Sequence, residues 1–151
     1  MTSNTLILYA LWSGLAGALI PVMAALNGTL GRSIQSPLHA SLIAVGLSFA
    51  AVGVTLMAFR PAMPNLAVLG SAPPLAYFGG LAMAFYALTA TFLAPRFGVG
   101  NIVISVVVAQ LAMAALIDQF GLFGAPVHPL DLKRVGGLVL LAAGAALVAL
   151  K

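Results

Sequence analysis

The polar side chains that could do chemistry in this chain are few, and most of them stand alone inside long apolar stretches. Gln110 is the clearest, because it lies between Ser-Val-Val-Val-Ala and Leu-Ala-Met-Ala-Ala. A carboxamide in hydrocarbon is costly unless its donors and acceptors are matched, so this side chain must face protein or water. Two roles fit it: a bond to a neighbouring helix, or a contact to a substrate or a proton path.

The acid nearest to this group is Asp118, eight residues further along (118 − 110). On a helix the two side chains lie about 80° apart, so they can border one cleft. An acid at the carboxyl end of a helix opposes the helix dipole, and we therefore expect Asp118 to have a cationic partner. If the activity of this chain is coupled to protons, Asp118 is the acid to carry them. The candidate partners are Lys133, Arg134 and Arg32.

Each of the other isolated polar groups allows two interpretations. Tyr86 lies deep in an apolar run, where its hydroxyl needs either a neighbouring helix or a substrate. Asn101 either caps a helix or faces a cavity. A third set, spaced by seven residues, is either a polar pore wall or a packing seam whose hydroxyls bond their own backbone. That set is Ser41, Ser48 and Thr55.

The composition excludes several kinds of chemistry. With no cysteine, two acids and two histidines, the chain offers no acid/base pair, metal cluster or phosphate loop, and we expect neither an enzyme nor a cofactor. Neither His39 nor His128 has a second ligand at metal-binding spacing. The six Lys and Arg residues are scattered singly, so no nucleic-acid patch is expected, although the net charge is +4.

The elements that must position these groups are membrane helices. Hydrophobic residues make up 63% of the chain and charged residues 5%, which a water-soluble fold cannot accommodate. A helical span needs about 20 apolar residues. The runs are continuously apolar rather than alternating, so the fold class is an all-α membrane protein, one domain over 1–151. The five predicted spans are 6–26, 38–59, 75–93, 99–117 and 135–150.

Features inside these runs predict local structure. Pro21 should kink the first span, since it removes one backbone hydrogen bond. The stretch 27–32 predicts a turn, after which Ser36 should cap a helix that begins at Pro37. Gly137 and Gly144 share one face of the last span, where small residues allow close packing within or between subunits.

The distribution of positive charges does not favour either orientation of the chain in the membrane. With five spans, one side holds Arg60, Lys133 and Arg134, three cations, and the other holds Arg32, Arg96 and Lys151, also three. The excess of Lys and Arg that normally stays in the cytoplasm is therefore missing. Either one orientation still predominates, or both orientations are populated and the two forms pair as an antiparallel dimer.

Several short motifs together resemble the YdcZ-type family of small bacterial inner-membrane proteins, within the drug/metabolite transporter superfamily. The resemblance runs over essentially the whole chain and rests on five landmarks in order. These are 27–32 with 36–40, Phe78-Gly79-Gly80, 94–98, Gln110 with 117–124, and 134–137. It implies a five-helix half-transporter that works as an antiparallel homodimer. The last span also resembles the dimerising helix of the small multidrug resistance proteins, but the first span lacks their glutamate, so their proton-exchange mechanism does not carry over.

From the residues and the resemblance together we expect an exporter of a small molecule that works by alternating access. The dimer, the bilayer and this unidentified substrate are its partners, and the bacterial inner membrane is its location. Without a charge in mid-span, a neutral polar or weakly aromatic substrate is favoured. The alternatives are a passive channel and a non-transporting accessory subunit. The expected cavity lining is Trp12, Asn27, Tyr86, Asn101, Ser105 and Gln110.

Overall fold

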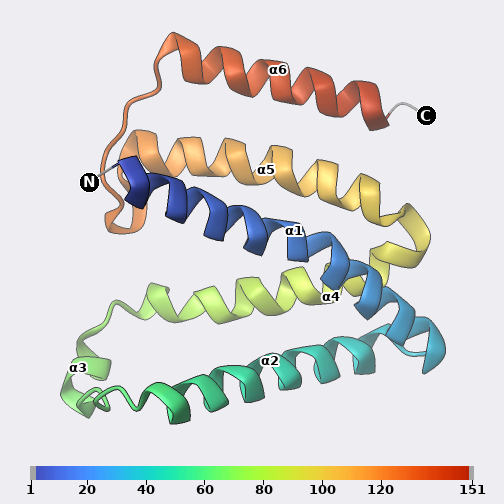
Figure 1. Ribbon diagram of the computed structural model, residues 1–151, viewed down its shortest axis with the longest axis vertical. Coiled ribbons are helices and arrows are strands. Elements are labelled where there is room, and N and C mark those ends of the chain that lie inside the picture. The colour runs from blue at the N-terminus through green and yellow to red at the C-terminus, as the bar shows by residue number, and fades with distance from the viewer. Residues whose placement is uncertain (1–2, 150–151) are drawn as a thin grey trace. The chain divides into compact units, whose positions relative to one another are not determined.

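The computed structural model describes residues 3–149, and every element of regular structure in that range is helical. The chain divides into two units, Met1–Arg96 and Phe97–Lys151, and each is treated by itself. The long helices of the first unit are α1 (Ser3–Ser33), α2 (Pro37–Phe59) and α4 (Gly79–Phe97), with the short α3 (Leu66–Ser71) and the 3-10 helix η1 (Pro74–Phe78) between the last two (Figure 1). The second unit holds α5 (Val99–Phe120), the 3-10 helix η2 (Leu122–Gly124) and α6 (Leu132–Ala149).

Among the described residues, four stretches are long and apolar enough to cross a membrane: Asn4–Ser33, Pro37–Phe59, Pro74–Phe97 and Val99–Phe120. The prediction of an all-helical, multi-pass membrane protein is therefore confirmed. The fifth predicted span, 135–150, corresponds to α6, which is not among the four. Lys133 and Arg134 occupy its first turn, and its apolar part begins only at Val135. Residues 150 and 151 lie outside the described range.

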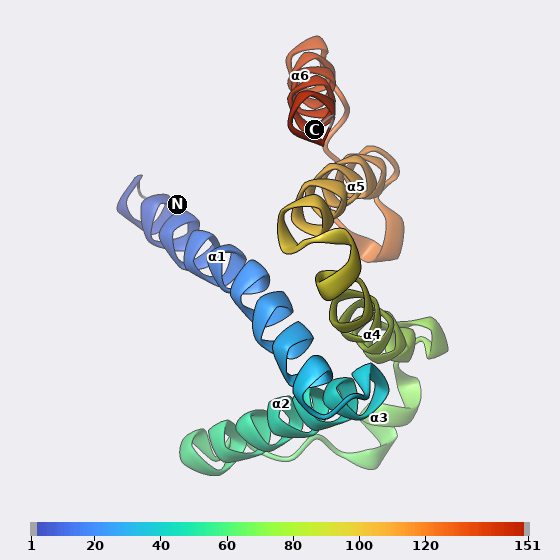
Figure 2. The same cartoon turned by 90° about the vertical axis from the view of Figure 1, so that its right-hand side faces the viewer.

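The first unit is held together where α1, α2 and α4 meet. The carboxyl end of α1 lies beside the start of α2, and the two helices diverge from there (Figures 1 and 2). Small residues make this junction possible, since a Cβ on Gly28 would lie 2.9 Å from the Ala94 Cβ, and one on Gly31 would lie 3.3 Å from the Pro37 Cα. The buried core at this end is correspondingly small: Ala24, Ala40, Ala87, Ala90, Thr91 and Ala94.

The turn between α1 and α2 lies later than the sequence indicates. Residues 27–32 were expected to form a turn, but α1 continues through them to Ser33. Ile34 and Ser36 then donate to the carbonyls of Leu30 and Gly31, both at 3.0 Å, and close the helix. Ser36 caps α2 and Pro37 is its first residue, which confirms that part of the prediction.

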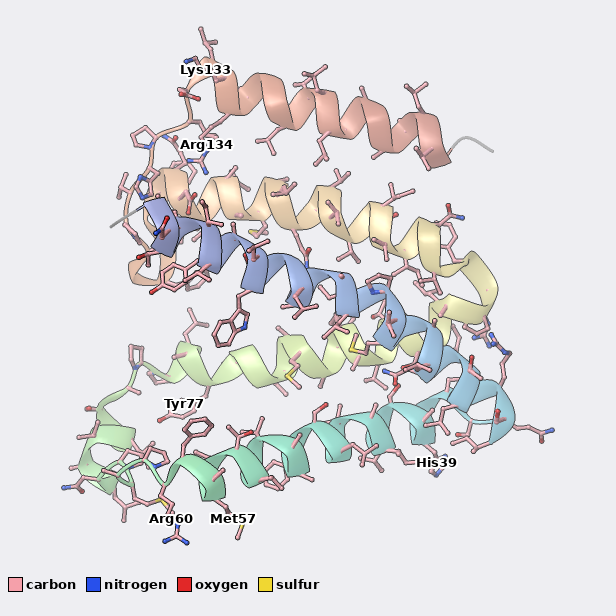
Figure 3. All side chains as sticks on the ribbon, viewed as in Figure 1. His39, Met57, Arg60, Tyr77, Lys133 and Arg134 are labelled. Carbon is pink, nitrogen blue, oxygen red and sulfur yellow. The ribbon has the colours of Figure 1, made fainter. Side chains whose placement is uncertain are left out.

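The link after α2 begins at Arg60, whose backbone is left-handed (φ 41°). Its N–H donates to the Leu56 carbonyl at 2.8 Å and ends the helix. Farther along the link, the Tyr77 hydroxyl donates to the Leu69 carbonyl at 2.6 Å, which ties η1 to α3. Figure 3 shows Arg60 and His39 at opposite ends of α2, so this link and the α1–α2 turn lie at opposite ends of that helix.

In the second unit, α5 and α6 form a helical hairpin. Gly121 ends α5 in the left-handed conformation (φ 60°), and an added Cβ there would lie 2.7 Å from the Val127 side chain. The returning link is anchored to the end of α5, because the His128 N–H donates to the Asp118 carbonyl at 2.8 Å. The Leu130 N–H donates to Gln119 Oε1 at 2.6 Å. The α5–α6 link is therefore a hydrogen-bonded loop rather than a free tether.

Candidate functional site

The six residues expected to line a cavity are divided between the two units. Trp12, Asn27 and Tyr86 belong to the first unit, whereas Asn101, Ser105 and Gln110 belong to α5 in the second. Each group is therefore described on its own helix. The hollows described below are lined by other residues, so the six stay a prediction rather than an observed cavity.

Asn27 has the most unusual environment of the six. Its side chain is 8% exposed, at the end of α1 where that helix approaches α4. Among the described residues, its Nδ2 is the only buried side-chain nitrogen or oxygen without a hydrogen-bond partner. Thr91, which is fully buried, satisfies its hydroxyl by donating to the Ala87 carbonyl at 2.8 Å. Since buried polar groups are almost always matched, Asn27 has a donor available for a ligand, a water or a second chain.

The two aromatic members of the first unit differ in exposure. Trp12 is 77% exposed on α1, so its ring does not pack into the first unit. Tyr86 is half-buried on α4. In membrane, a ring as open as that of Trp12 contacts lipid or another subunit.

On α5, two of the three polar groups are satisfied locally. Asn101 Nδ2 donates to the Phe97 carbonyl at 2.8 Å, and Ser105 Oγ donates to the Asn101 carbonyl at 2.9 Å. The cap of α5 is Gly98 (φ 86°), which leaves Asn101 inside the first turn. Gln110 is exposed. Its carboxamide therefore remains the polar group of this helix that most needs a partner in lipid.

The hydroxyls spaced by seven residues on α2 all bond their own helix. Ser41 donates to the Pro37 carbonyl at 3.0 Å, Ser48 to the Ala44 carbonyl at 2.9 Å, and Thr55 to the Ala51 carbonyl at 2.9 Å. This is the arrangement expected of the packing seam. A hydroxyl engaged in this way presents little unsatisfied polarity to a pore.

Asp118 forms an ion pair with Arg134, at 2.7 Å between Oδ2 and Nη2. The same guanidinium donates to the His128 carbonyl at 3.1 Å, so Arg134 joins the end of α5 to the link. Figure 3 shows Arg134 directed toward α5 and Lys133 directed away from it. The side chains are 40% and 32% exposed for Arg134 and Asp118, which places the pair at the edge of the unit.

The remaining predicted residues concern helix shape and packing. Pro21 lies within α1, which is a single helix from Ser3 to Ser33.

Gly137 and Gly144 each line a hollow between α5 and α6. A Cβ on either glycine would meet no heavy atom within 4 Å, so the space beside both is open.

Sequence reasoning missed a hollow of about 350 Å³ in the first unit, where α1, α2 and α4 meet and two arginines contribute to the lining. We call it the arginine hollow. Its two arginines entered the sequence analysis as charges in the orientation count, and Arg32 also as a candidate partner of Asp118, but neither was expected to line a cavity. A signal was present, since each lies in the last turn of its helix, near a glycine or proline. The lining includes Gly31, Arg32, Gln35, Pro37, Thr91 and Arg96.

An apolar groove adjoins this hollow, with a volume of about 520 Å³ between α2 and α4. We call it the α2–α4 groove. Pro37 lines both spaces. Within residues 3–149, no three His, Cys, Asp or Glu side chains gather as a metal site would require. The other lining residues of the groove include Leu38, Phe85, Leu88, Thr89 and Phe92.

A comparison with known protein families identifies the family of this chain. The sequence profile of the family described as "putative inner membrane exporter, YdcZ" matches residues 8–147, which is nearly the whole chain. Searches of curated proteins and of solved structures gave no match. The match covers all four candidate spans and α6 almost completely, and it confirms the resemblance drawn from the short motifs. The chain therefore belongs to the YdcZ family of inner-membrane exporters within the drug/metabolite transporter group.

Proposed function

We propose that this protein is a half-transporter with five membrane spans, which exports a small molecule as an antiparallel homodimer by alternating access. The family supports export, and four apolar helices support membrane crossing. The fifth span would be α6, accommodated by thinner lipid or by its flanking residues. Two copies in opposite orientation would create a pseudo-two-fold axis in the membrane plane, with the substrate site near the midplane.

The observation that carries the dimer is the scarcity of internal packing. Buried hydrophobic residues among those described are seven, six of them alanines. Nearly every large apolar side chain is exposed, including Trp12 at 77%. Gln110 is exposed as well, and the Nδ2 of Asn27 has no partner. A second copy would supply both the missing apolar contacts and acceptors for these amides.

The balance of charge supports the antiparallel arrangement. Three cations fall on each side of a five-span chain, so insertion has no strong directional preference. The open faces at Gly137 and Gly144 offer α6 as a place where a second chain can approach closely.

A neutral polar or weakly aromatic substrate fits the polar groups best. The chain has two acids, and both are engaged in the α5–α6 link: Asp118 with Arg134, and Asp131 through Oδ1 with the Arg134 N–H at 2.7 Å. Neither carboxylate lies in the middle of a span, so a cationic substrate would find no counter-ion there. Amide and phenol groups such as Asn27, Gln110 and Tyr86 suit a substrate that donates and accepts hydrogen bonds.

The absence of cysteine provides a clean test of orientation. Ala62→Cys, in the link after α2, and Ser33→Cys, at the end of α1, each introduce one thiol on opposite sides of the membrane. In intact cells, a membrane-impermeant maleimide should label about half of the protein at both positions, because both orientations are populated. Ala50→Cys, in the middle of α2, is the control and should stay unlabelled.

Complete labelling at one position with none at the other would contradict dual orientation. Strong labelling of Ala50→Cys would contradict membrane burial of α2 altogether. The first outcome tests the orientation of the chain and the second tests whether α2 lies in the membrane, so the experiment distinguishes the two claims.

A further inference from the structure

The arginine hollow is lined by two cations, and neither forms an ion pair within residues 3–149. Asp118 pairs with the Arg134 guanidinium, and Asp131 accepts from the Arg134 backbone N–H, both in the second unit. Arg32 and Arg96 line one hollow within the first unit. Two arginines that line one hollow, with no carboxylate among its other lining residues, favour an anionic ligand from outside the chain.

Each guanidinium is held by a single hydrogen bond to its own helix. Arg32 Nη2 donates to Thr29 Oγ1 at 3.1 Å, and Arg96 Nη1 donates to the Phe92 carbonyl at 2.6 Å. A guanidinium has five N–H donors, so most of them remain available. The last carbonyls of α1 do not need Arg32, because Ile34, Gln35 and Ser36 already donate to them.

The ends of membrane spans are expected near the depth of the lipid phosphates, and the hollow lies at such ends. Arg32 and Arg96 occupy the last turns of α1 and α4, at the ends of two candidate spans. Basic pockets between membrane helices at this level are suited to phospholipid headgroups. Both leaflets of the bilayer contain lipid phosphates, so the hollow would meet them whichever way the chain is inserted.

The adjoining α2–α4 groove has the shape that an acyl chain needs. It continues from Pro37, which also lines the hollow, along α4 from Phe92 to Phe85. The seven helical steps from Phe85 to Phe92 span about 10 Å, roughly two thirds of the thickness of one leaflet. The Phe92 ring joins the two parts, since it lines the groove while the Arg96 guanidinium lies 3.8 Å above its centre.

We propose that the arginine hollow and the α2–α4 groove together bind one phospholipid, with its phosphate between Arg32 and Arg96 and an acyl chain along α4. The inference does not rest on the antiparallel dimer, because both spaces belong to one unit of one chain. It rests on two arginines that line one hollow without a carboxylate, and on Pro37, which lines both that hollow and the apolar groove.

Native mass spectrometry of the purified full chain tests this assignment. Phosphatidylglycerol is the probe, and its affinity for the double variant R32Q/R96Q should fall about 25-fold, since one cation near a headgroup contributes a factor of about five. The matched control is R60Q, an exposed cation at the other end of α2, which should change the affinity less than two-fold. Equal retention by wild type and the double variant would overturn the proposal.

A second pair of variants tests the groove. Leu88→Trp fills it and should also lower phosphatidylglycerol retention, whereas Leu81→Trp, two turns earlier on the same helix and outside the groove, should not. Far-UV circular dichroism should show that all four variants remain folded. If Leu88→Trp instead dissociates a dimer and leaves lipid retention unchanged, the groove holds a second copy and the proposal is wrong.

Two further probes separate the parts of the ligand. Diacylglycerol has the chains without the phosphate, and inorganic phosphate has the charge without the chains. Neither should bind measurably at the concentration where phosphatidylglycerol saturates the protein. Equal binding of diacylglycerol would remove the role of the arginines, and equal binding of inorganic phosphate would make this a site for free anions; either result overturns the phospholipid assignment.

Discussion

Gly28→Ala is the substitution that most directly tests how the first unit is packed. An added Cβ on Gly28 would lie 2.9 Å from the Ala94 Cβ and 3.5 Å from the Pro95 Cδ. Carbon atoms in optimal contact are about 3.5–4.0 Å apart. The Ala94 methyl is fixed to its backbone and cannot rotate away, so α1 and α4 must separate by several tenths of an ångström.

The expected loss can be isolated by comparison with Gly14→Ala on the same helix. A Cβ on Gly14 would meet nothing within 4 Å, so this control keeps the helix-propensity gain of about 0.5–1 kcal/mol. Gly28→Ala has the same gain but also the overpacking cost of about 1–3 kcal/mol. The difference between the two variants in the free energy of unfolding should therefore be about 1–3 kcal/mol.

The assay is unfolding by sodium dodecyl sulfate in mixed micelles, followed by far-UV circular dichroism. Ala94→Gly should rescue Gly28→Ala, because it removes the atom that the new methyl meets. The double variant should recover most of the lost free energy, a coupling of about 1–3 kcal/mol. Equal stability of Gly28→Ala and Gly14→Ala, or strict additivity in the double variant, would refute the close approach of α1 and α4.

Three further predictions use the same reasoning. Asp118→Asn should destabilise the chain by only about 0.5–1 kcal/mol in the same unfolding assay, because its ion pair with Arg134 is partly exposed. The control Lys133→Gln should leave the free energy of unfolding unchanged, since Lys133 is directed away from α5. A loss above about 3 kcal/mol for Asp118→Asn would mean that the pair is buried in the working protein. Ser48→Ala should change stability by less than about 0.5 kcal/mol and leave transport unchanged, since its hydroxyl bonds the Ala44 carbonyl; a loss of flux would restore the pore-wall reading. Gln110→Leu should weaken self-association in liposomes, measured by energy transfer, by about 0.6–1.7 kcal/mol or roughly three- to eighteen-fold; an unchanged dimer fraction would mean that Gln110 faces no partner.

The fold was predictable where the pattern is strong. Continuous apolar runs identified the long helices, and Ser36 followed by Pro37 located the start of α2. The turn predicted over 27–32 was wrong because local propensity was read without tertiary context. Gly28 and Gly31 serve there as contact points for other helices, and Thr29 and Ser33 bond carbonyls of their own helix at 2.9 and 3.0 Å. α1 therefore continues where the composition suggests a loop.

The candidate site was predictable only in part. Sequence identified the polar residues that are unusual in lipid, and Arg134 was among three cations considered for Asp118. It could not tell that Asn27 is buried without an acceptor while Trp12 is exposed, because that depends on which helix faces are covered. The arginine hollow was missed for a related reason: Arg32 and Arg96 are 64 residues apart (96 − 32) and line one hollow only because the ends of α1 and α4 approach each other.

The claim that two oppositely oriented copies form the working unit is tested most directly by co-purification of orientation-locked variants. Ala62→Lys with Ala67→Lys changes the count of cations from three against three to five against three, and Ser33→Lys with Ile34→Lys reverses that excess. With different affinity tags, the two locked forms should co-purify when expressed together, whereas two copies locked in the same direction should not. Efficient pairing of same-direction copies, with none between opposite ones, would contradict the antiparallel dimer.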